Sequence, residues 1–322
     1  MPRSFVLSLV LASCFAAAPL SAQVPESIQW HTNVVSAVNR AAAERKPLVV
    51  FFYAEGEDGM LPWSRKLAEG PLASREVSAM QERAVFLKVN VDLDDAFGNV
   101  KKLKDGLKVK EFPTVAVLDS TPQGCVDRGQ TVGFLEQAEF VDRLRTLVTF
   151  AMVKIRATLT PPLAASEIPG RVVEVQAELS RRNTVLTERA NAYRQQLADL
   201  LERGAFDWTT FAKAAAEREE AHVQLQDSIF SLATIPAPEA EAMGTIFARL
   251  SLAELDDCRQ LQQDLHRLTV EGKLLDPASV ERARRLVQAA DKSSSNELQQ
   301  SQQTLREASD RYNRWLNELA AK

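Results

Sequence analysis

The apolar positions of the chain follow two different patterns, and the change falls near residue 160. Before it, short apolar runs rich in Val and Phe have the length of buried strands. These runs cover 47–53, 84–92 and 114–120, and 124–129 follows as an edge strand. Helix-like segments lie near 33–45, 62–82 and 94–107, and another begins near 135. Strands that alternate with helices predict an α/β unit with a central mixed sheet flanked by helices.

After residue 160, apolar residues recur every seven positions, as on long helices that pack against one another. The clearest repeats are Val172, Leu179, Leu186, Tyr193 and Leu200, and then Leu298, Leu305, Tyr312 and Leu319. Gly204 and the segments 235–240 and 272–279 interrupt the pattern. Four helices are therefore expected, as an all-α bundle or a coiled-coil hairpin. Intramolecular packing is the favoured interpretation of the repeats, and a structural oligomer assembled through the helices is the alternative.

The segment "TLTPPLAASEIPG", 158–170, separates the two patterns. Its three prolines and small polar residues are typical of a linker. At 322 residues the chain can bury two separate cores. The sequence thus predicts an α/β domain over 25–157, a linker over 158–170 and a helical domain over 171–322.

Residues 1–22 have the pattern of an export signal. Arg3 precedes an apolar run, and small residues end at Ala22, after which cleavage is expected. Export to a bacterial periplasm or cell envelope follows from this pattern. A second interpretation uses Leu11 to Cys14 as a lipobox, which would make Cys14 a lipid anchor in a lipoprotein. Beyond Ala22 no stretch has the roughly 20 apolar residues that span a bilayer.

Composition narrows the choice of partner only slightly. The formal net charge is −4, and 25% of residues are charged with both signs interspersed. Nothing in this balance favours nucleic acid as a partner. No cofactor motif is present, and protein or peptide partners remain the expectation.

Several segments of the first domain resemble the thioredoxin superfamily, particularly its exported members. These are "IQW" at 28–30, "AAAERKPLVVFFYAE" at 41–55, "FLKVNVD" at 86–92 and "VKEFPTVAVLD" at 109–119. The resemblance covers roughly 28–150 and implies a thioredoxin-like fold with a cis peptide bond before Pro113. It also implies a Cys-x-x-Cys pair where a helix follows the first long strand.

That cysteine pair is missing from this chain. Aligning "WSRKL" with the family pattern puts Leu61 and Ser64 at the two positions, whereas a gap-free alignment puts Glu57 and Met60 there. Disulfide exchange needs a thiolate to attack and a second thiol to resolve the mixed disulfide. Neither alignment supplies one, so no catalytic residue is assigned, and Ser64 is expected to be a hydroxyl on the helix surface.

Loss of the thiols leaves a binding role as the favoured interpretation. The resemblance implies a surface for extended peptides, with Trp63, Phe112 and Pro113 as candidates, although a purely structural role for Pro113 is an equal alternative. The rival hypothesis is an atypical thiol-disulfide oxidoreductase, or a redox partner protein, that uses Cys125. Cys258 is expected in a helical core, either free or paired with Cys125.

Other polar residues favour ordinary structural roles. No metal site is predicted, because the carboxylates have none of the spacing of a calcium loop. They are Glu55, Glu57, Asp58, Asp92, Asp94 and Asp95, and solvated turns are expected there. His222 and His266 lie on or beside apolar helix stripes, which favours buried or half-buried structural histidines. With His31 these are the only histidines, so Ser64 has no evident catalytic partner.

Overall fold

A computed structural model describes residues 27–57, 59–93, 97–121, 124–203, 208–270 and 277–320. The chain divides into two compact units, Val24–Pro162 and Leu163–Lys322 at its C-terminal end. The division falls inside the segment predicted as a linker. Asp58, Asp94, Asp95 and the predicted export signal with Cys14 lie outside the described residues.

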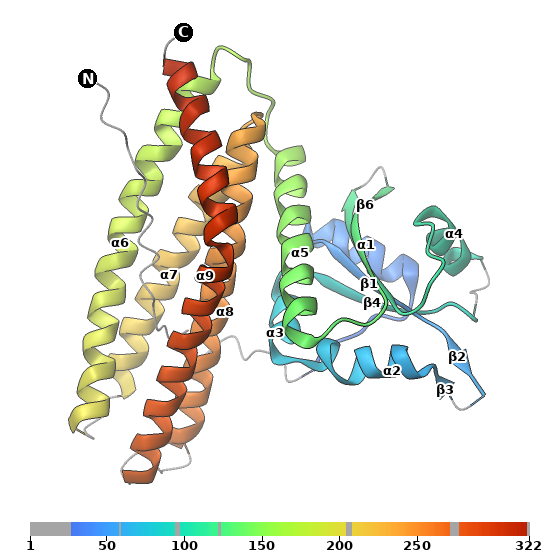
Figure 1. Ribbon diagram of the computed structural model, residues 1–322, viewed down its shortest axis with the longest axis horizontal. Helices are drawn as coiled ribbons and strands as arrows, with labels where there is room; N and C mark the ends of the chain where they lie inside the picture. The colour runs from blue at the N-terminus through green and yellow to red at the C-terminus, as the bar shows by residue number, and fades with distance from the viewer. Residues whose placement is uncertain are drawn as a thin grey trace. The chain divides into compact units, whose positions relative to one another are not determined.

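The first unit is an α/β structure built around one four-stranded sheet (Figure 1). Its strands are β1 (Leu48–Tyr53), β4 (Val85–Asn90), β5 (Thr114–Thr121) and β6 (Gly124–Val132). Its helices are α1 (Val34–Glu44), α2 (Pro62–Glu69), α3 (Arg75–Ala79), α4 (Asn99–Gly106) and α5 (Gln137–Leu159). Each predicted strand is present.

The sheet has the order β4-β1-β5-β6 and is mixed, as predicted. β1 is parallel to β4 and antiparallel to β5, and β5 is antiparallel to β6. Beside β4, the backbone at His31 forms a single parallel bridge with Leu87. This order, with the cis bond between Phe112 and Pro113 just before β5, is the thioredoxin-like fold that the sequence predicts.

Both faces of the sheet are buried, because side chains of β1 alternate between two cores. Phe51 packs in one core with Val117 and with Phe140 of α5. Phe52 packs in the other core with Leu118 and with Ala37 of α1. The continuous apolar run of β1 is thus explained by burial on both sides.

The predicted helix over 62–82 is wrong as a single element. α2 ends at Glu69, and two short 3₁₀ turns at Pro71–Ala73 and Met80–Glu82 flank the five-residue α3. Gly70 leaves the helical conformation at φ −105° and ψ −101°, and Pro71 has no N–H for a continuing helix. A small antiparallel hairpin of β2 (Glu55–Gly56) and β3 (Gly59–Met60) also replaces a predicted loop.

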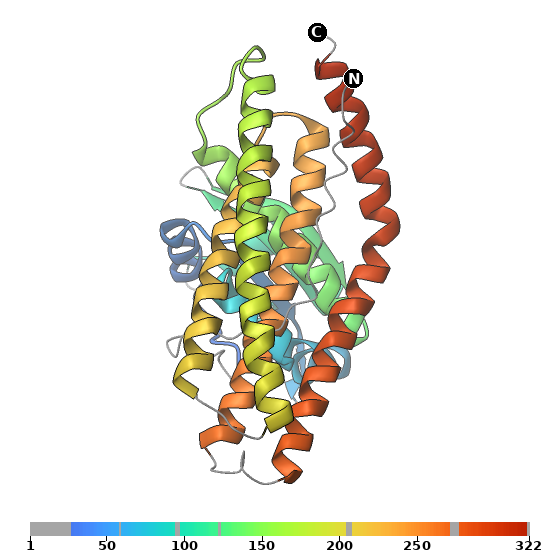
Figure 2. The same ribbon diagram turned by 90° about the vertical axis from the view of Figure 1, so that its left-hand side faces the viewer.

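The second unit contains four long helices in its described part, in agreement with the sequence. They are α6 (Ile168–Arg203), α7 (Trp208–Ala233), α8 (Pro238–Val270) and α9 (Pro277–Ala320). Successive helices lie side by side and reverse direction (Figure 2). The seven-residue repeat forms their interior: Val172, Leu179 and Tyr193 of α6 are buried, as is Tyr312 of α9. Because α5 continues to Leu159 and α6 begins at Ile168, the connecting segment is shorter than the predicted linker.

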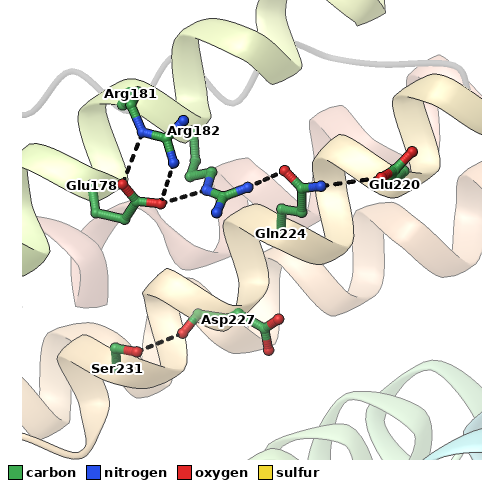
Figure 3. Close-up of polar contacts among 7 residues, drawn as sticks. All are labelled: Glu178, Arg181, Arg182, Glu220, Gln224, Asp227 and Ser231. Atoms are coloured by element: carbon green, nitrogen blue, oxygen red, sulfur yellow. Dashed lines mark hydrogen bonds and ion pairs between the residues drawn. The ribbon is translucent and has the colours of Figure 1, made fainter.

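Polar contacts also join α6 to α7 on the outside of this unit (Figure 3). Arg182 of α6 donates both to Glu178 of its own helix and to the side-chain oxygen of Gln224 on α7. Arg181 donates to the same carboxylate, and these hydrogen bonds lower the pKa of Glu178 to about 2.

Within the described ranges, no helix of either unit is both long and apolar enough to cross a membrane.

Candidate peptide-binding site

The first turn of α2 holds the two positions at which the resemblance implies cysteines. Leu61 is the N-cap residue, its N–H donates to Ala54 O at 3.0 Å, and its C=O accepts from Arg65 N at 2.9 Å. Ser64 lies one turn further along the same helix. Glu57 and Met60, the positions of the other alignment, lie in the β2–β3 hairpin instead.

Ser64 is fully buried, which contradicts the prediction of a surface hydroxyl. The same side of α2 also buries Leu67, three residues later, so Ser64 belongs to the face turned toward the core. Among the described residues, none hydrogen-bonds to Ser64 Oγ. A hydroxyl cannot form a disulfide, and no described residue accepts a hydrogen bond from it as an activating base would.

Pro113 is held at the start of β5. Pro113 is buried, and its C=O accepts from Gly133 N at 2.8 Å, just beyond the end of β6. Phe112 is half-buried and packs against the core on the α1 face. No described residue hydrogen-bonds to the backbone N–H or C=O of Phe112. Phe112 therefore keeps a backbone donor and a backbone acceptor with which an extended chain could pair.

Trp63 is the exposed member of the predicted set, at 60% relative exposure. Its ring lies 5.9 Å from the ring of Phe134, and Lys66 Nζ lies 4.0 Å from the Phe134 centroid and 5.4 Å from that of Trp63. Sequence reasoning missed Phe134. The sequence gives no signal for Phe134, because only the pairing of β6 with β5 brings the segment after Val132 next to Pro113.

Cys125 does not belong to this group of residues. It faces Ser120 of β5, whereas Val132 at the other end of β6 faces Thr114 beside Pro113. Seven residues of strand span roughly 23 Å. Its thiol is free, and burial of the sulfur raises its pKa despite the opposing hydrogen bond with Ser120. A raised pKa leaves less of the reactive thiolate at neutral pH.

The remaining candidates are structural in their geometry. Cys258 is buried in the helical unit and forms no disulfide, as expected for a core thiol, and burial raises its pKa to about 12. His222 is buried, and its Nε2 lies 2.8 Å from Ser251 Oγ. Asp92 Oδ2 accepts from Glu55 N at 2.7 Å, which ties the hairpin to the loop after β4. No group of three potential metal ligands occurs within the described part of the chain.

Comparisons with known proteins give a limited result. No protein-family model matches the chain, and no curated protein matches it. A thioredoxin from Thermus thermophilus, known from its solution structure, is similar at a TM-score of 0.32 and 24% identity over 38% of this chain and 87% of that chain. A DsbH oxidoreductase is similar at a TM-score of 0.33 and 16% identity, over 41% of this chain and 94% of that chain.

These similarities are too low to carry an argument on their own. The class of the first unit follows from its strand order, its two cores and the cis peptide bond at Pro113. The molecule is accordingly a thioredoxin-like unit followed by a helical unit.

Proposed function

We propose that this protein is an exported, redox-inactive binding module that takes up an extended segment of a protein or peptide. The surface is the edge where Trp63 is exposed and the backbone of Phe112 has no partner among the described residues. The observation that carries the proposal is that the backbone N–H and C=O of Phe112 have no partner among the described residues. Pairing through the backbone needs no particular partner sequence. Export rests on the pattern of residues 1–22, with a periplasm or envelope as the destination.

A redox role for the first turn of α2 is not part of this proposal. Leu61 and Ser64 carry a hydrocarbon and a hydroxyl, and neither can form the mixed disulfide that exchange requires. The helix N-terminus, which in a thiol enzyme would lower the pKa of the attacking cysteine, has no sulfur to act on.

Binding can be measured with a fluorescein-labelled, carboxymethylated unfolded protein added to the chain that begins at Gln23. We expect saturable binding that is weakened about tenfold, or about 1.4 kcal/mol, by Trp63→Ala. Val35→Ala is the matched control, since Val35 is an exposed apolar residue of α1 outside the proposed surface. No saturable binding, or equal weakening by both variants, would refute the proposed surface.

The atypical thiol enzyme remains the competing function, and an insulin-reduction assay separates it from binding. The proposal predicts no turnover by the chain that begins at Gln23. Turnover that disappears in Cys125→Ser would overturn it. Sedimentation of the same chain addresses the structural oligomer, for which we expect a monomer because the heptad positions are used within one bundle.

A further inference from the structure

A layer of buried polar side chains crosses the interface between α7 and α8. Arg218 of α7 is fully buried, and its Nη2 lies 3.4 Å from Glu254 Oε1 and 3.4 Å from Cys258 Sγ, both on α8. The same guanidinium lies 5.7 Å from the centre of the Tyr193 ring on α6. Sequence reasoning did not identify this layer, because Arg218 stands in a run of charged residues typical of an exposed helix face.

Two further contacts between α7 and α8 belong to the same layer. Arg259 Nη2 donates to Glu219 Oε1 at 2.5 Å, and both side chains are largely buried. His222 Nε2 lies 2.8 Å from Ser251 Oγ and 2.9 Å from Ser251 O. At three neighbouring places the interface therefore contains contacts between polar groups in place of purely apolar packing.

Such a layer is a poor source of stability. Removing charges from water is costly, and apolar residues of similar volume in their place often leave a protein equally or more stable. The best attested use of buried polar residues in helical assemblies is to specify one alignment of the helices. An apolar seven-residue repeat alone is satisfied again after a shift of seven residues, which is about 10.5 Å along a helix.

We propose that the polar layer holds α7 and α8 in one alignment and prevents them from sliding or rotating against each other. Any other alignment would separate Arg218 from Glu254 and bury its charge among apolar side chains. These two helices of the unit then keep one fixed alignment. The alternative anchor is the short connection at 234–237, which contains Pro236.

The alignment can be measured by the distance between spin labels on α7 and α8 in the chain that begins at Gln23. Val223→Cys and Arg267→Cys place the labels on exposed positions. A Cys125→Ser background removes the exposed native thiol, and Cys258 is kept because it is buried and contacts Arg218 in the layer. We expect one narrow distance in this protein.

The decisive variant makes the whole layer apolar, by replacing both ion pairs and the histidine–serine contact: Arg218→Met, Glu219→Leu, His222→Leu, Ser251→Ala, Glu254→Leu and Arg259→Met. We expect a folded protein whose melting temperature is unchanged or higher and whose label distance becomes broad or split by about 10 Å. The matched control is Arg189→Met with Glu217→Leu, an exposed ion pair between α6 and α7, which should leave the distance unchanged. A narrow, unchanged distance in the apolar variant would overturn the proposal and assign the alignment to 234–237.

A second test does not depend on how the apolar variant folds. Glu219→Arg places two arginines opposite each other in the layer and should broaden the label distance. Adding Arg259→Glu restores a matched pair in the opposite orientation and should restore the narrow distance. Failure of this rescue, or no effect of the single variant, would contradict a role in alignment.

Discussion

Ser64 differs from a cysteine by one atom, yet that atom decides the chemistry available to the first turn of α2. Its burial places the hydroxyl where a resolving thiol would lie, while Leu61 at the N-cap is partly exposed. The two residues are one helical turn apart, a spacing at which two cysteine Cα atoms fall within disulfide reach. The backbone of this turn is therefore suited to a disulfide that the side chains do not supply.

Cysteines introduced at positions 61 and 64 should form a disulfide. In Leu61→Cys with Ser64→Cys we expect an intramolecular disulfide to form in oxidised glutathione, detected by mass spectrometry as a loss of two hydrogens. Leu61→Cys with Trp63→Cys is the matched control, because those side chains point in different directions on the helix. A double variant that stays reduced would show that this turn lacks the required geometry.

The two native thiols of the described chain should differ sharply in reactivity. Burial raises the pKa of Cys258 to about 12, which leaves on the order of 10⁻⁴ of it as thiolate at pH 8. We expect a thiol reagent at pH 8 to modify Cys125 in the native protein and Cys258 only after unfolding. The fraction of Cys258 thiolate should stay small up to about pH 10 and rise as the pH approaches 12.

Cys125→Ser provides the control for this measurement. In the chain that begins at Gln23, the native variant should incorporate no reagent at pH 8, and the unfolded variant should incorporate one equivalent. Rapid modification of two thiols in the native protein would contradict the burial of Cys258.

Sequence reasoning at this scale predicts Trp63 and Pro113 as candidates because each lies in a short stretch resembling a known pattern, and the structure shows that Trp63 is exposed and that the bond before Pro113 is cis. The sequence places Ser64 on the wrong face of the helix, since a single hydroxyl between Trp63 and Arg65 gives no sign of which face it occupies. Arg218 was missed for the same reason. Burial of one polar residue depends on what packs above it, and local patterns do not contain that information.

Among the elements, α7 and α8 approach each other closely at Gly244. A methyl group added there would lie 2.5 to 2.6 Å from the backbone N and Cα of Ala233. Because those atoms are backbone, the helices would have to separate, so Gly244→Ala should lower the free energy of unfolding by about 1–3 kcal/mol. Urea denaturation followed by circular dichroism measures this change.

Gly170→Ala is the matched control in α6, where nothing lies within 4 Å of the added methyl group. There the free energy of unfolding should be unchanged or rise by about 0.5–1 kcal/mol, since alanine favours helix. Equal effects of the two substitutions would show that the crossing is not tight.

Strands and helices were largely predictable because their periodicities are set by burial. β1, β4 and β5 begin and end within about two residues of their predicted limits, and the four long helices follow the seven-residue repeat. The helix predicted over 62–82 failed because its apolar spacing continues across Gly70 and Pro71, where the backbone cannot. The β2–β3 hairpin has too few residues to produce a periodic signal.

For the whole molecule, the connection between α5 and α6 should be the first point of proteolysis. Residues 160–167 are almost all exposed and lie between helices, so their backbone is accessible to a protease. We expect brief elastase treatment to produce two fragments, one ending and one beginning within 160–167, identified by mass spectrometry. Initial cleavage inside α6 or α7 would contradict the division into two compact units.

Cys125 lies near the first residue of β6. The last residue, Val132, pairs with Thr114, and Gly133 just beyond it donates to the C=O of Pro113. A dye or a surface linker coupled to this sulfur would therefore sit far from the proposed contact edge. The native chain can therefore be labelled at Cys125 to follow binding of a peptide over time, while the residues proposed to bind it stay unmodified.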